Sequence, residues 1–185
     1  MTIKLDNLDG IPVHLAAELH GQTPVFRNHR FVEKLLAHRT LSRIAHDLDS
    51  LCLEEGVVGY HFTRAVRPQI ATRGLIAANG DDRRREFLAE HGHRVSDLQR
   101  KRISQSWQSY STSSQTEMRH GRVRFNFTLA GLTGGDADDL LAYYGGENIN
   151  MPLTQDEEIA NIVRTIGEPL IIQCALDARS LHAFC

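Results

Sequence analysis

The stretch that decides the fold is Val57-Val58-Gly59-Tyr60-His61-Phe62-Thr63. Its apolar start predicts a buried β-strand. Side chains two positions apart lie on the same face of a strand, so His61 and Thr63 would project together. A neutral imidazole offers one hydrogen-bond donor and one acceptor, and the threonine adds a hydroxyl. The pair therefore predicts a site for a polar ligand at the end of this strand. The simpler alternative is a buried histidine that is bonded to the backbone.

The residues before this strand predict a helical N-terminal region. Residues 1–28, which contain Pro12 and Pro24, are expected to form an irregular or short-stranded arm. Apolar residues at helical spacing then predict a helical pair over residues 29–55. We expect a single domain, with residues 1–55 as the arm and helical pair and residues 56–185 as a mixed core.

The residues after the strand alternate between helical and extended patterns. A short helix is expected over residues 64–73, with Pro68 in its first turn and Gly74 at its end. Residues 122–129 alternate strictly between polar and apolar side chains and predict a strand, and the apolar run 169–176 predicts a central one. Further helices are expected over residues 81–90, 95–109 and 136–144, and after a capping box formed by Thr154 and Glu157. The fold class is α+β, with a mostly antiparallel, split β-sheet and packed helices.

The composition narrows the class of protein. The chain has 185 residues and a formal net charge of -2, which gives no global signature of nucleic-acid or membrane binding. The 3 cysteines are far apart and odd in number, so neither a zinc ribbon nor a disulfide framework is indicated. Neither a signal peptide nor an apolar run of transmembrane length stands out. We expect a soluble, cytoplasmic protein with no metal site and no membrane partner.

A second candidate site lies in Tyr143-Tyr144-Gly145-Gly146-Glu147. Two glycines before an acid allow the backbone to approach a ligand closely. Glu147 could then pair with a sugar hydroxyl or stabilise a cationic centre. The alternative is a helix that ends at Gly145, with Glu147 in solvent.

Arginines supply candidate phosphate contacts. Arg83-Arg84-Arg85 and Arg100-Lys101-Arg102 could form one cationic surface, although two solvated helical faces explain them as well. Arg124 lies on the polar face of the 122–129 segment and could hold a phosphate with both ends of its guanidinium.

The first motif of the ADP-ribosyltransferase superfamily resembles Tyr60-His61-Phe62-Thr63 followed by Arg73-Gly74-Leu75. In that superfamily, which includes toxin-like members, a strand-borne histidine holds the nicotinamide-side ribose of NAD. A Tyr or Ser on a later strand forms the second motif, and a glutamate that orients the ribose 2′-hydroxyl forms the third. The resemblance covers positions 60–75. The third motif could map to Glu147 or, second in preference, to Glu157 or Glu158, and the second to Tyr110, Ser111 or Thr112.

The resemblance implies an enzyme that uses NAD as its substrate and transfers ADP-ribose to a protein or nucleic acid, as a toxin or a factor in defence or counter-defence. Nicotinamide would leave through an oxocarbenium-like centre, which a carboxylate stabilises. His61 and Glu147 are the implied catalytic residues. Arg64 or Arg73 would contact the pyrophosphate, and an aromatic ring would stack on nicotinamide. The implied NAD-binding residues are His61, Thr63, Arg64, Arg73, Tyr143 and Tyr144.

Two other functions stay open. The chain could be a non-catalytic interaction protein on a degenerate transferase fold, binding protein or nucleic acid through its arginine-rich helices. It could also be a ribonuclease toxin that uses His61 and nearby arginines. NAD would not raise the melting temperature in the first case, and RNA would be cleaved without NAD in the second.

Overall fold

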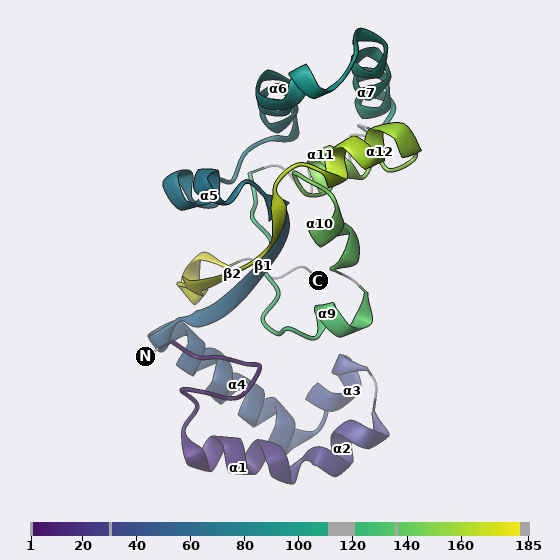
Figure 1. Ribbon diagram of the computed structural model, residues 1–185. Coiled ribbons are helices and arrows are strands. Elements are labelled where there is room, and N and C mark those ends of the chain that lie inside the picture. Colours follow the sequence, from purple (N-terminus) through teal and green to yellow (C-terminus); the bar gives the residue numbers. More distant parts are fainter. Residues whose placement is uncertain (1, 30, 111–120, 136, 182–185) are drawn as a thin grey trace. The chain divides into compact units, whose positions relative to one another are not determined.

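The structure is a computed structural model that describes residues 2–29, 31–110, 121–135 and 137–181 (Figure 1). The chain divides into two compact units. Unit 1 comprises Met1–Tyr60, Asn126–Leu129 and Gln173–Cys185, and unit 2 comprises His61–Phe125 and Ala130–Ile172. The α+β class is confirmed: helices are mixed with an antiparallel pair of strands, and the N-terminal region is helical.

Residues 2–12 form isolated bridges and turns, as expected for an irregular or short-stranded arm. The expectation is wrong for residues 13–28, which are mainly helical, because Pro12 and Pro24 stand at helix starts, where a missing N–H costs no hydrogen bond. The helical pair over residues 29–55 is confirmed. The helices are α1 (Val13–Gly21), α2 (Thr23–Asn28), α3 (Val32–Leu36) and α4 (Arg39–Glu55).

The core of unit 1 forms between α1, α4 and the start of the chain. Ile3, Ile11, Leu15 and Ile44 are its buried members. Gly56 ends α4 with a φ of 79°, a conformation that favours glycine. The chain enters its first strand directly after this turn.

The strand β1 (Val57–Ala65) is largely buried and pairs with β2 (Glu168–Leu176) (Figure 1). On its other edge, backbone groups of alternate residues bond to three separate segments. Val58 N–H donates to the Ile3 carbonyl, Tyr60 exchanges two hydrogen bonds with Asn126, and the Arg64 carbonyl accepts from Gly145. β1 is therefore the central strand.

Two strand predictions need correction. Residues 122–129 form no strand and contribute a single bridge, between Asn126 and Tyr60. Alternating polarity shows which side chains face inward, but a strand also needs a partner along its length. The 169–176 strand exists as part of β2. It was expected to be central, but among the described strands it pairs with β1 alone, and exposed and half-buried residues alternate along it.

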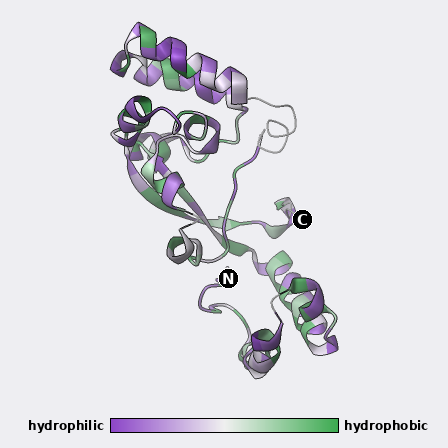
Figure 2. Ribbon diagram, turned by 90° about the vertical axis from the view of Figure 1, so that its right-hand side faces the viewer, coloured by the Kyte–Doolittle hydropathy of each residue, from purple (hydrophilic) through white to green (hydrophobic). Residues whose placement is uncertain are grey.

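Unit 2 is mainly helical, and its helices carry hydrophilic and hydrophobic residues side by side (Figure 2). Phe87, Ile103, Trp107 and Ile159 belong to its buried core. The helices are α5 (Arg67–Arg73), α6 (Gly80–His91), α7 (Asp97–Tyr110), α9 (Gly131–Gly134), α10 (Asp138–Ala142), α11 (Glu147–Asn150) and α12 (Glu157–Arg164). None of the helices in the described ranges is both long and apolar enough to cross a bilayer.

Helix ends in unit 2 follow local chemistry. Pro68 lies in the first turn of α5 and Gly74 caps its end, as predicted. The predicted cap of α12 is wrong, since Asp156 accepts the hydrogen bond from Ile159 N–H at 3.3 Å. Thr154 lies before the helix and donates its hydroxyl to the Met151 carbonyl.

Candidate functional site

His61 lies on β1 with its imidazole bonded to the backbone. Its Nδ1 is 2.9 Å from the carbonyl oxygen of Arg124. A carbonyl only accepts, so Nδ1 carries a hydrogen, and in the neutral ring Nε2 then keeps a lone pair. Burial lowers the pKa of His61, and the bond to Arg124 opposes this shift. The ring is therefore neutral near pH 7, with the buried Thr63 two positions along the same strand.

Glu147 is the first residue of α11 and follows a turn that only glycine permits. Gly145 and Gly146 have φ values of 87° and 67°. A Cβ on Gly145 would lie 2.7 Å from Cγ1 of Ile149, so the space beside this glycine is filled by the protein itself. The alternative of a helix ending at Gly145 is wrong, because α10 ends at Ala142 with Tyr143 as its cap.

Arg124 joins the two predicted catalytic residues. Its carbonyl oxygen accepts from His61, and its guanidinium Nη1 lies 3.4 Å from Oε2 of Glu147. All three residues belong to unit 2. The ion pair is partly exposed on both sides, so it contributes at most about 1 kcal/mol to stability. His61 and Glu147 thus contact opposite ends of one residue, the imidazole at the Arg124 backbone and the carboxylate at its guanidinium.

Arg64 holds the segment before Glu147 against β1. Its carbonyl accepts from Gly145 N–H at 3.3 Å. Its guanidinium donates to the carbonyls of Ile166, Gly167 and Leu141 at 2.9, 3.1 and 3.4 Å. A pyrophosphate contact from Arg64 would compete with these carbonyls.

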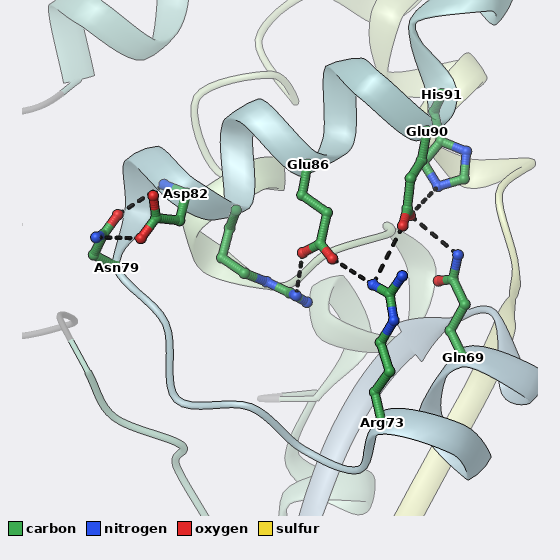
Figure 3. Close-up of polar contacts among 8 residues, drawn as sticks. Gln69, Arg73, Asn79, Asp82, Glu86, Glu90 and His91 are labelled. Carbon is green, nitrogen blue, oxygen red and sulfur yellow. Dashed lines mark hydrogen bonds and ion pairs between the residues drawn. The ribbon is translucent and has the colours of Figure 1, made fainter.

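Arg73 belongs to a polar cluster between α5 and α6 (Figure 3). Its guanidinium lies 2.6 Å from Glu86 and 3.4 Å from Glu90, and Gln69 also donates to Glu90. Glu90 lies 3.8 Å from the ring of His91, which is buried. A pyrophosphate would have to draw Arg73 away from two carboxylates.

The two predicted stacking residues are packed inside unit 2. Tyr144 meets the His91 ring edge-on at 4.8 Å, and burial raises the pKa of its hydroxyl. The guanidinium of Arg164 lies over the Tyr143 ring at 4.7 Å and also donates to the Tyr143 hydroxyl. One face of Tyr143 is thus already covered by a cation.

The second motif has one candidate with a described environment. Tyr110 ends α7 and donates to the sulfur of Met151 at 3.4 Å. Ser111 and Thr112 lie outside the described residues. Of the other acids proposed for the third motif, Glu158 pairs with Arg102 and Glu157 is exposed in the first turn of α12.

The two arginine clusters on α6 and α7 have intramolecular partners. Four of their arginines face carboxylates, and Arg100 faces a carbonyl, which weakens the case for a cationic surface that binds nucleic acid. The pairs are Arg83 with Glu86, Arg84 with Asp81, Arg85 with Asp82, Arg100 with the Gly92 carbonyl, and Arg102 with Asp156 and Glu158.

Arg124 was predicted only as a phosphate contact, and its link between His61 and Glu147 was missed. The alternation of polar and apolar residues in 122–129 predicts that Arg124 lies on a polar face. It does not predict which residues lie beside Arg124, because these come from distant parts of the sequence. Within the ranges that the structure describes, no three His, Cys, Asp or Glu side chains are grouped to hold a metal ion. Comparison with known protein families, curated proteins and solved structures finds no match for this chain.

Proposed function

We propose that this protein is an NAD-dependent ADP-ribosyltransferase with its site around His61, Arg124 and Glu147. The observation that carries the proposal is that Arg124 contacts both residues. Its backbone carbonyl lies 2.9 Å from the His61 imidazole, and its guanidinium lies 3.4 Å from the Glu147 carboxylate. His61 and Glu147, which lie far apart in the sequence, thus share a neighbour. The neutral state of His61 also supports the proposal, because a ribose hydroxyl needs an acceptor.

Each group has a role in the proposed reaction. Nε2 of His61 accepts the hydrogen of a ribose hydroxyl, and Thr63 contributes its hydroxyl on the same strand face. The bond between C1′ and the nicotinamide nitrogen breaks, and its electron pair leaves with nicotinamide. Glu147 stabilises the positive charge that develops on the ribose. The acceptor then forms a bond to C1′ and loses its proton to solvent.

Arg124 has to change partner in this scheme. A guanidinium beside Glu147 opposes a second positive charge at C1′. We therefore assign Arg124 to the pyrophosphate of bound NAD, which would leave the carboxylate facing the ribose. Because the ion pair between Arg124 and Glu147 is partly exposed, breaking it costs only about 1 kcal/mol or less. Arg64 and Arg73 come second as pyrophosphate contacts, because carbonyls and carboxylates already hold them.

The test is the substitution Glu147→Gln. We expect NAD turnover to fall by about a hundredfold or more, since the charge that stabilises the transition state is gone. The melting temperature should change by only a few degrees, because the lost ion pair is worth about 1 kcal/mol or less. Glu168→Gln is the matched control, since it also removes a partly exposed carboxylate paired with an arginine, Arg67, and should retain turnover. Normal turnover in Glu147→Gln would contradict the proposal.

The acceptor is identified by labelling. Cell lysate is incubated with the protein and NAD labelled on its adenylate part, and the product is digested with protease or with nuclease. Label released by only one treatment assigns the acceptor to protein or to nucleic acid. A protein that gives no transfer and no thermal shift with NAD is the interaction protein, and one that cleaves RNA without NAD is the ribonuclease.

A further inference from the structure

The short helix that carries Glu147 is held by side chains from two other helices. α11 has only four residues, so its last carbonyls lack partners within the helix. Nε of Arg84, on α6, donates to the Asn148 carbonyl at 3.3 Å. Nε1 of Trp107, on α7, donates to the next carbonyl, that of Ile149, at 3.2 Å. Two successive carbonyls of α11 are thus capped from outside.

The two donors also contact each other. The guanidinium carbon of Arg84 lies 5.7 Å from the centre of the Trp107 ring. Trp107 is 5% exposed and the Arg84 side chain 14%, so water has little access to either contact. Phe87 packs edge-on against the indole at 5.8 Å and fixes its plane. A carbonyl that lost its donor here would stay unsatisfied.

We infer that Arg84 and Trp107 are positioning residues for Glu147, an inference that rests on the proposed function. A single helical turn has almost no stability of its own, so its direction depends on what holds it. The positive-φ turn at Gly145 and Gly146 fixes where α11 begins, with Gly146 as its N-cap. Arg84 and Trp107 fix where α11 ends. Together they set the direction in which the Glu147 carboxylate leaves the backbone.

The test separates the missing hydrogen bond from a general loss of stability. Trp107→Phe keeps a buried aromatic ring but removes the donor, and Arg84→Lys keeps the charge but removes Nε. Ile103→Val, at a fully buried position on α7, loosens the same core without touching either bond. We expect kcat for NAD turnover to fall about tenfold in Trp107→Phe and Arg84→Lys, with KM within about twofold, because the carboxylate is misplaced but NAD still binds. Ile103→Val should keep kcat near that of the wild type.

Amide hydrogen exchange over residues 147–153 gives a readout that does not depend on NAD. We expect exchange in this segment to quicken about tenfold in Trp107→Phe and to stay unchanged in Ile103→Val. If the wild type shows no NAD turnover, the proposed function fails, and exchange alone decides whether the two residues hold α11. Exchange that matches the Ile103→Val control would overturn the inference, as would a kcat no lower than that of the control.

Discussion

Replacing Arg64 by lysine should destabilise the protein because one guanidinium serves three carbonyls. Nε lies 2.9 Å from the Ile166 carbonyl, and the terminal nitrogens reach those of Gly167 and Leu141. A lysine ammonium is a compact point charge and cannot span this set. Arg67 is the matched control, three positions further along, where the guanidinium pairs with Glu168 in solvent.

The expected loss follows from burial. A hydrogen bond from a charged donor is worth about 1.5–3 kcal/mol when its loss leaves a buried carbonyl unsatisfied. The bonds to Ile166 and Leu141 are partly buried, whereas water can replace the exposed bond to Gly167. Since lysine can keep one contact, we expect Arg64→Lys to lower the free energy of unfolding by about 2–3 kcal/mol. Arg67→Lys should cost less than about 1 kcal/mol, because its side chain is 67% exposed.

Equilibrium unfolding in urea measures both variants. The reasoning predicts a lower midpoint for Arg64→Lys with an unchanged m-value, in the absence of any ligand. Two variants that agree within about 0.5 kcal/mol would refute it. If Arg64 mainly contacts the pyrophosphate, the pattern reverses: stability is retained and NAD binding weakens. The same two proteins therefore separate a structural role from a binding role.

Two further predictions concern protonation and backbone conformation. Burial lowers the pKa of His61 from its ordinary value of 6.5, so the unfolded chain binds protons more readily and stability falls as the pH drops below 6.5. In His61→Gln the free energy of unfolding should decrease less below pH 6.5 than in the wild type. Urea unfolding on either side of pH 6.5 measures this difference, and equal pH dependence in both proteins would contradict the prediction. Gly167→Ala should cost more than Gly74→Ala, because both glycines have positive φ but only at Gly167 would a Cβ strike a backbone carbonyl, that of Ala65. Urea midpoints that rank the two variants in the opposite order would show that this contact relaxes easily.

Local features of the fold were predictable because they depend on backbone chemistry. The apolar run at Val57 predicted β1, Gly56 ends the helix before it, and Gly74 ends α5. The N-terminal prolines were misread because proline disrupts the interior of a helix but suits its first turn. Proline thus indicates either the first turn of a helix or an irregular segment. The choice depends on where the helix starts, which the local sequence pattern does not show.

Long-range partners were not predictable in the same way. The 122–129 segment has the alternation of a strand, yet only Asn126 pairs with the backbone of β1. Local motifs predict His61 and Glu147 as site residues, but no sequence spacing predicts that both contact Arg124. Arg64 was expected to contact a pyrophosphate, and its guanidinium donates to the carbonyls of Leu141, within α10, and Ile166, after α12. Which of several arginines faces a ligand depends on the folded neighbours of each.

The paired arginines on α6 and α7 affect how any contact with nucleic acid would respond to salt. An unpaired cationic surface gains affinity for a polyanion by releasing condensed counterions, so its binding weakens steeply as ionic strength rises. An arginine that already faces a carboxylate must break that ion pair before it can contact a phosphate. Exchanging the carboxylate for a phosphate therefore adds little binding affinity. Binding through these helices would therefore depend only weakly on salt. A steep dependence would instead trace the contact to cations elsewhere on the chain.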